Sequence, residues 1–388
     1  MEKETINTPY EIQKLMESSV SLTRLPKVIE YMYNANLNLF VWGYMGIGKT
    51  ASVEQFVARQ REKNKDFGYM YFPLASILPE DLTGIPMPYK DETTGLNRTA
   101  YAVPKSLPTD PNSVGVLVFD EFNNASPSVQ NAVQQLVQER RIGDYTLPKG
   151  WWVIAMGNQS GVNAYSNEIQ APVKDRFGHI FVRSNVDSWI DYTMGLQEID
   201  NDTLPFLPNI TPDQIRNLTC AFVKRNPDKL FDETEYNKNS YTFATPRSWS
   251  RFIQLYSKNL NATKTDVKCF ASMFLGGDIA NLIVDYFENS TKYQDPYEIL
   301  LGKEKFKAEK DMNGFMGTLM GCISVLVEKP NAEHLSNLVK AGLELKQLEN
   351  QTILGKMIMN KSVLKPLIKK EQFTELAKVI SAKQVQAI

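Results

Sequence analysis

The eight residues Gly43–Thr50 constrain the fold of this chain more than any other stretch of its sequence. They read GYMGIGKT, follow the apolar run LNLFVW and precede a helical pattern, so they fit G-x-x-x-x-G-K-[ST] in the strand-to-helix context that the motif requires. Glycines in such a loop permit backbone conformations that side chains would block, which lets successive N–H groups and the N-terminus of the next helix point at phosphate oxygens. The stretch therefore predicts a loop that holds a nucleoside triphosphate.

Two side chains of this loop carry the chemistry that such a site needs. Lys49 would reach the β and γ phosphates, and the Thr50 hydroxyl would ligate Mg²⁺. A glycine-rich turn with an exposed lysine is the alternative interpretation, and the flanking strand and helix argue against it. The residues that we predict to contact the nucleotide are Gly43, Tyr44, Met45, Gly46, Ile47, Gly48, Lys49, Thr50 and Ala51.

Five short β-rich runs alternate with helical segments in the first half of the chain. Each run is almost continuously apolar, which is typical of strands buried on both faces of a parallel sheet that helices cover. The runs lie at 37–43, 68–75, 114–120, 151–157 and 179–184. The predicted fold class is therefore α/β, with a five-stranded parallel sheet between helices.

Two polar inserts interrupt this alternation. Residues 83–108 are too long and too rich in turn residues for a simple connection, and we predict a protruding hairpin there. Residues 140–150 carry the turn chemistry of a second hairpin. Between the inserts, Ser126 and Pro127 form a helix start that is followed by apolar residues at helical spacing. From about residue 186 onward helical patterns replace the strands.

A pair of carboxylates, Asp120 and Glu121, follows the apolar run VGVLVF. Ligands bind beyond the carboxyl ends of strands in open α/β sheets, so this pair is a candidate for the same site as the loop. Asp120 would hold Mg²⁺, usually through water, and Glu121 would orient or deprotonate an attacking water. A solvated corner or a helix cap is the alternative for two adjacent acids.

Three further polar residues lie where a hydrolysing site would need them. Asn158 directly follows the run WWVIAMG, Arg176 lies in VKDRFGHI and Arg247 lies in ATPRSWSR. Asparagine at a strand end is commonly turn chemistry, and an arginine at an element boundary is commonly a salt-bridge partner. These residues become catalytic candidates only together with the loop and the carboxylates.

Composition excludes several classes of protein. The chain has 388 residues and a formal net charge of −1, so no global field draws it to nucleic acid or to an anionic membrane. Its three cysteines are far apart and contain no CxxC pair, which indicates neither a disulfide framework nor a zinc site. We see neither a signal peptide nor a run of 18 apolar residues, and we expect a cytoplasmic protein.

Taken together, these motifs resemble the AAA+ ATPases and, within them, the MoxR-like branch, which is related to magnesium chelatase ATPase subunits and to midasin. The stretch VFDEFNNASPSVQNAVQQLVQERRIGDYTLPKGWWVIAMGNQ carries the acidic pair, the helix start, the hairpin entry and the asparagine in the family's order. PEDLTGIPMP with YAVPKSLP is similar to the branch's insert in its second helix, DRF to its arginine-finger region and TPRSWS to its second sensor. The resemblance covers roughly residues 37–288.

This resemblance implies roles for the polar residues and a division into three parts. Asn158 would be the first sensor, Arg176 the finger that reaches a neighbouring subunit's nucleotide, and Arg247 the second sensor. Residues 1–185 would form the ATP- and Mg²⁺-binding core and residues 186–290 the helical lid. Residues 291–388 would form a helical region of unknown role, whose stretch 351–388 holds seven lysines against two glutamates.

The resemblance also implies an assembly and partners. A finger that acts in a neighbouring subunit implies a homo-oligomeric ring, which we expect to be a hexamer. MoxR-like proteins act as chaperone-like remodellers of a protein client, beside a separate partner that carries a von Willebrand factor A domain. Binding to nucleic acid and membrane is not expected.

Two functional alternatives remain open from the sequence. A nucleic-acid-directed motor of McrB type would use local basic character such as Arg140 and Arg141, and its binding would depend strongly on salt. A nucleotide-stabilised scaffold would assemble without turnover, although it would not need the water-activating acid Glu121. An inherited magnesium-chelatase activity is a narrower option.

Overall fold

The computed structural model describes residues 19–158, 169–183, 186–194, 204–290, 293–306 and 312–385. The chain forms two compact units. The first consists of residues 1–204 and 231–280, and the second of residues 205–230 and 281–388.

The first unit is built on a fully parallel six-stranded sheet with the order β1-β10-β2-β9-β6-β3. Its strands are β1 (Ser19–Ser21), β2 (Leu39–Trp42), β3 (Gly68–Pro73), β6 (Val114–Asp120), β9 (Gly150–Gly157) and β10 (Gly178–Arg183). This confirms the predicted α/β class and all five predicted strands. The prediction of five strands missed β1, because three residues that read Ser-Val-Ser give no apolar run, and only pairing with β10 makes them a strand.

Helices cover both faces of this sheet. On one face, Phe119 and Val153 share an apolar cluster with Val133 of α5 (Pro127–Glu139). On the other face, Trp152 meets the ring of Phe56 from α3 (Lys49–Lys63), with ring centroids 5.9 Å apart. Alternate residues of each central strand therefore enter opposite cores, which explains why the strands read as continuous apolar runs.

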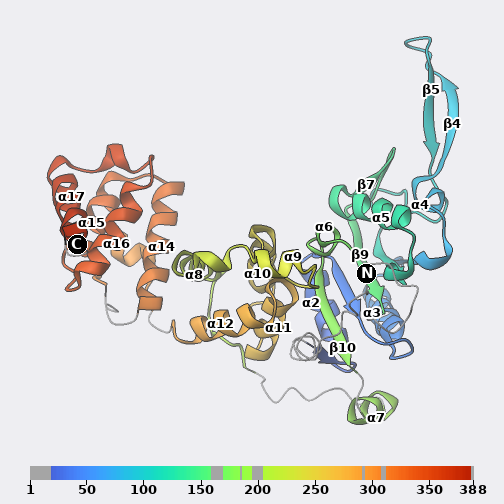
Figure 1. Ribbon diagram of the computed structural model, residues 1–388, viewed down its shortest axis with the longest axis horizontal. Helices are drawn as coiled ribbons and strands as arrows, with labels where there is room; N and C mark the ends of the chain where they lie inside the picture. The colour runs from blue at the N-terminus through green and yellow to red at the C-terminus, as the bar shows by residue number, and fades with distance from the viewer. Residues whose placement is uncertain are drawn as a thin grey trace, which may run out of the picture. The chain divides into compact units, whose positions relative to one another are not determined.

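The predicted inserts are hairpins. Strands β4 (Ile85–Lys90) and β5 (Asn97–Ala102) pair antiparallel, and their hairpin projects from the rest of the first unit (Figure 1). Ile85, Met87 and Tyr89 are exposed along it. The shorter hairpin consists of β7 (Arg141–Ile142) and β8 (Tyr145–Thr146).

The remaining elements are helical. In the first unit they are α2 (Leu25–Asn34), η1 (Leu74–Ser76), α4 (Glu80–Thr83), η2 (Phe122–Asn124), α6 (Ala171–Lys174), α7 (Val186–Met194), α9 (Glu233–Asn237), α10 (Pro246–Lys258) and α11 (Lys264–Leu275). The second unit holds α8 (Pro212–Arg225), η3 (Pro227–Lys229), α13 (Pro296–Leu300), α14 (Met312–Glu328), α15 (Ala332–Leu343), α16 (Leu348–Met359), η4 (Lys365–Leu367) and α17 (Lys370–Val385). The boundary between the units falls inside α12 (Gly277–Glu288).

The compact units do not follow the predicted limits at residues 185 and 290. Helix α8 belongs with α14 in the second unit, whereas α10 and α11 belong with the sheet in the first. The division into core, lid and C-terminal region remains a prediction about function. None of the helices in the described ranges combines the length and the apolar character that a membrane span requires.

Candidate functional site

Three neighbouring strands bring the predicted site residues to one edge of the sheet. In the register of β2, β9 and β6, Trp42 pairs with Gly157 and Phe119 pairs with Ala155. The loop after β2, Asn158 after β9 and the acidic pair that ends β6 therefore begin side by side. Carboxyl ends of parallel strands meet at the same edge, so this arrangement follows from the topology.

The loop between β2 and α3 requires its glycines. Gly46 and Gly48 have φ of 77° and 95°, in the left-handed region that residues with a Cβ rarely adopt. A Cβ added at Gly46 would meet no atom within 4 Å, so this part of the loop borders open space. Gly48 caps α3, and the N–H groups of the first turn have no intrahelical partners. The loop thus presents unpaired donors beside an accessible space.

Lys49 is the central cation of the site. It is only 7% exposed, and its ammonium donates to the carbonyl oxygens of Gly43 and Tyr44, both at 2.9 Å, and to Asn158 Oδ1 at 3.2 Å. Burial lowers the pKa of the Lys49 ammonium, and the charge of Asp120 opposes part of that shift. Loop carbonyls and one amide oxygen, all neutral, therefore hold this charge.

The end of β6 carries the two carboxylates. Asp120 accepts hydrogen bonds from the Thr50 hydroxyl at 3.3 Å and from the Tyr71 hydroxyl at 2.9 Å. Its other oxygen accepts from the backbone N–H of Glu121 at 2.7 Å. Burial and, after it, the hydrogen bond to Asp120 raise the pKa of Tyr71, so the phenol stays a donor. Glu121 itself has a left-handed backbone with φ of 54°, which directs the chain out of the strand.

Asn158 is fixed by a partner that the sequence analysis did not identify. Its backbone N–H donates to Asn123 Oδ1, and its carbonyl accepts from Asn123 Nδ2, both at 3.0 Å. Both asparagines are buried. This reciprocal pair frees the Asn158 side chain for Lys49.

Arg176 lies after α6, and its guanidinium is buried within its own chain. It donates to the carbonyl of Pro172 and to Gln138 Oε1 of α5. Its Nε has no hydrogen-bond partner. Burial lowers the pKa of Arg176, with Arg247 adding to the shift and Asp175 opposing it. Among the described residues, no carboxylate forms an ion pair with this guanidinium, so its charge is incompletely satisfied.

Asp175 connects this segment to the start of α10. Its carboxylate accepts from the Thr245 hydroxyl at 2.8 Å and forms an ion pair with Arg247, whose side chain is 50% exposed. The carbonyl of Asp175 accepts from Arg251, and burial lowers the pKa of Arg251 to about 10. The two predicted arginines thus lie near one acid, and neither makes a described contact with the loop.

The sequence analysis missed Tyr71, Asn123 and Asp175. Asn123 is the first of the two asparagines in the quoted DEFNNASP stretch, so its position after the acidic pair was a usable signal. Asp175 likewise precedes Arg176 in the quoted DRF. Tyr71 lies in a strand whose residues gave no sign of which side chain would reach Asp120.

The residues present fit a nucleotide with Mg²⁺. The left-handed glycines, the open space at Gly46 and the neutral partners of Lys49 suit phosphate oxygens. Thr50 and Asp120 supply two oxygens for a cation, whereas no group of three or more His, Cys, Asp or Glu residues that could hold a metal exists in the described ranges. Mg²⁺ is commonly bound in this way, by one or two protein oxygens with phosphate and water.

Comparison with known families agrees with this geometry. Residues 38–177 match the family model of the AAA domain, dynein-related subfamily. Over these residues the chain is similar to an AAA domain. The match runs from the residue before β2 to the residue after Arg176, so the loop, the acidic pair and Asn158 all lie inside it. It confirms the predicted resemblance to AAA+ proteins.

Two solved structures share a weak likeness with the larger part of the chain. A candidate ATPase from Cytophaga hutchinsonii has a TM-score of 0.42 and 15% identity, with 71% of this chain and 93% of that chain covered. NtrX from Brucella abortus has a TM-score of 0.29 and 13% identity, with 82% of this chain and 68% of that chain covered. These scores are too low to add to the assignment of the AAA domain. No curated protein matches the sequence.

Proposed function

We propose that this chain is a MoxR-like AAA+ ATPase that hydrolyses ATP in a hexameric ring and remodels a partner protein or complex. The observation that carries the proposal is the convergence at one sheet edge of Lys49, the Thr50–Asp120 hydrogen bond and Asn158. A binding loop alone would not need a carboxylate pair and an amide placed beside it. The cytoplasm is the compartment that we propose for it.

Each residue has a distinct role in this proposal. The N–H groups of residues 43–51 and the Lys49 ammonium bind the phosphates, and Thr50 and Asp120 hold Mg²⁺, which neutralises phosphate charge when it is bound. Glu121 orients the attacking water and accepts its proton, while Asn158 Oδ1 or Nδ2 positions that water or the γ-phosphate. Asn123 is a positioning residue, because it acts through Asn158.

Arg176 would complete the site of the neighbouring subunit. Its neutral acceptors, Pro172 O and Gln138 Oε1, are weaker partners for a guanidinium than a phosphate is. If Arg176 moves from these acceptors to a neighbour's γ-phosphate, it exchanges hydrogen bonds to neutral oxygens for hydrogen bonds to charged ones. Arg247 would act from the lid as the second sensor, after it releases Asp175.

The projecting β4–β5 hairpin is the part that we propose to meet the client. Its exposed Ile85, Met87 and Tyr89 offer apolar contact on an element that makes no core of its own. Movement of the lid on hydrolysis would be transmitted through this hairpin and the β7–β8 hairpin. A separate protein with a von Willebrand factor A domain is the proposed partner.

The test is steady-state hydrolysis of ATP and of GTP by the full chain, with and without EDTA, for wild type and Glu121→Gln. Wild type should hydrolyse ATP only with Mg²⁺. Glu121→Gln should bind a fluorescent ATP analogue with unchanged affinity and lose at least 100-fold in turnover (order of magnitude). Equal turnover in both proteins would remove Glu121 from the mechanism, and no turnover in either would favour the scaffold alternative.

A further inference from the structure

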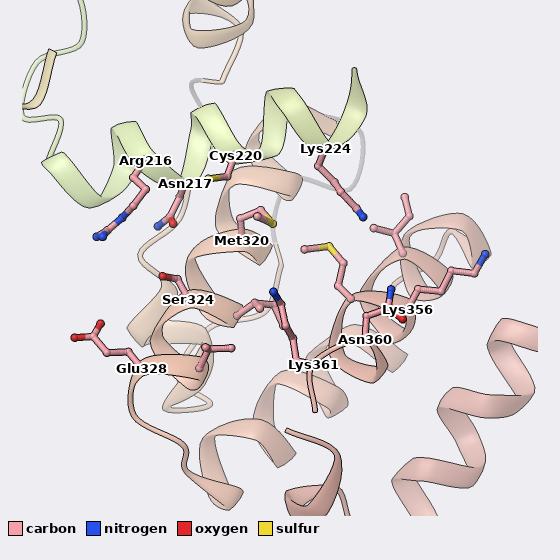
Figure 2. A pocket seen from close by; sticks show the side chains of 14 residues that line it. Arg216, Asn217, Cys220, Lys224, Met320, Ser324, Glu328, Lys356, Asn360 and Lys361 are labelled. Carbon is pink, nitrogen blue, oxygen red and sulfur yellow. The ribbon is translucent and has the colours of Figure 1, made fainter. Parts of the chain in front are cut away.

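Three helices of the second unit leave a groove between them. Helices α8, α14 and α16 surround a partly open cavity of about 610 Å³, and Figure 2 shows the side chains that line it. All of its lining residues belong to this unit, and none belongs to the candidate nucleotide site. The groove therefore calls for an explanation of its own.

The floor of the groove is apolar. Met320, Ile323 and Val327 recur at helical spacing on α14, and Ile353 and Met357 lie one turn apart on α16. Such stripes normally pack against another helix. Val327 is 39% exposed although it belongs to this stripe. Methionine side chains adapt their shape to a partner, so this floor suits a bound apolar surface.

The rim of the groove is basic. Arg216 and Lys224 line it from α8, and Lys356 and Lys361 line it from α16 and the turn that follows, whereas Glu328 is the single acid of the lining. Arg216 also pairs with Asp213 outside the groove. Lys224, Lys356 and Lys361 form no ion pair with any residue in the described part of the chain. Figure 2 shows their side chains on the two sides of the opening.

We propose that this groove binds an amphipathic helix of a partner protein, with acidic residues flanking an apolar stripe. The cations are spread along the groove, since Arg216 and Lys224 are eight residues or about 12 Å apart on α8. A small carboxylate is too short to span this distance along α8. A helix with carboxylates two turns apart on one side can meet both cations of α8 while its apolar residues cover the floor.

This proposal does not rest on ATP hydrolysis, because the groove uses no residue of the nucleotide site. Binding should therefore be the same with and without nucleotide. Failure of the ATPase proposal would leave the docking proposal intact, and the reverse also holds.

The first experiment measures fluorescence anisotropy of a labelled 18-residue helical peptide with the full chain. The peptide carries leucines at i, i+3, i+4 and i+7 spacing with glutamates beside them, and a matched peptide carries lysines in place of the glutamates. We expect the acidic peptide to bind at least 10-fold more tightly, and to weaken as salt rises. Equal affinity for the two peptides, or no binding of the acidic peptide, would overturn the proposal.

Charge-reversal variants locate the binding. The double variant Lys224→Glu/Lys361→Glu should weaken the acidic peptide at least 10-fold and improve the lysine peptide. Lys369→Glu/Lys370→Glu changes the same charge at exposed positions outside the groove, and it should bind like wild type. If both double variants bound the acidic peptide equally weakly, the loss would come from the change in net charge, and this would contradict binding in the groove.

Cys220 provides a footprint within the groove. It lines the opening and is exposed, whereas Cys269 and Cys322 are buried, so iodoacetamide should modify Cys220 first. Partial desolvation by the neighbouring side chains raises the pKa of this thiol, so the labelling is done at alkaline pH. The acidic peptide should slow the modification. Protection by a fatty acid such as dodecanoate but not by the peptide would show a small-ligand site, and protection by higher chain concentration alone would show self-association; either result overturns the proposal.

Discussion

At the scale of single residues, Asn123 shows how the site is positioned. Its amide exchanges two 3.0 Å hydrogen bonds with the backbone of Asn158, which fixes where the Asn158 side chain meets Lys49. Removal of the Asn123 amide would leave a buried N–H and a buried carbonyl without partners. The geometry of Asn158 would then relax.

We predict that Asn123→Ala lowers kcat by roughly 10- to 100-fold while KM for ATP changes little, because small displacements of catalytic groups cost about this much. Steady-state hydrolysis by purified protein checks this. Asn124→Ala is the matched control, since the buried Asn124 Oδ1 makes no hydrogen bond. A loss of activity that is equal in both variants would contradict a positioning role.

His179 is a second residue whose state is set by its neighbours. The indole N–H of Trp42 donates to His179 Nδ1 at 2.8 Å, and His179 Nε2 lies 2.8 Å from the carbonyl of Lys174. Both partners fit a neutral ring that is protonated at Nε2, an assignment made from the hydrogen bonds. Burial lowers the pKa of His179 to about 3.

We predict that this histidine makes stability fall in acid. Its pKa in the folded chain lies below the ordinary value of about 6.5, so the unfolded chain takes up a proton first. The contribution of His179 to the free energy of unfolding is fully present above about pH 6.5. It is lost as the pH falls toward 3, at about 1.4 kcal/mol per pH unit. Urea unfolding at pH 7.5 and 5.0 should show a smaller loss in His179→Gln than in wild type. The same loss in both would contradict this account.

At the scale of elements, the sequence predicts those strands and helix ends that a local pattern of residues determines. All five apolar runs are strands, and Ser126 caps α5 as predicted, with its side chain accepting from Val129 N–H. Strand β1 and the contacts of Asp175 escape prediction, because each depends on residues far away in the sequence: β10 in one case and Thr245, Arg247 and Arg251 in the other. Nothing in a local pattern encodes these pairings.

The link between the segment after α6 and the start of α10 gives an element-scale prediction. Asp175 holds Arg247 in an ion pair that, in the proposed mechanism, competes with the nucleotide. Asp175→Asn should therefore raise the affinity for ATP by up to about five-fold. This factor corresponds to the free energy of up to about 1 kcal/mol that a half-exposed ion pair contributes. Titration with a fluorescent ATP analogue measures this, and thermal unfolding checks that the variant is folded. Weaker ATP binding by a folded variant would show instead that Asp175 orients Arg247 toward the nucleotide.

At the scale of the whole molecule, the account requires subunits to meet. A trans-acting arginine can contribute about 10³- to 10⁵-fold in rate, so an isolated subunit of such an enzyme turns over slowly. Among the described hydrogen bonds, the Arg176 guanidinium donates only to Pro172 and Gln138 of its own chain. Activity should therefore follow assembly, and the docking groove of the second unit should remain available whether or not the ring forms.

The most direct test is light scattering together with ATP hydrolysis on the same samples, for wild type and Arg176→Ala, across a range of protein concentrations. The account predicts that wild-type activity per subunit rises as rings form, and that Arg176→Ala assembles without hydrolysing ATP. A monomer with concentration-independent turnover, or a fully active Arg176→Ala, would contradict the ring mechanism and leave Arg176 as a structural residue that ties α5 to the segment after α6.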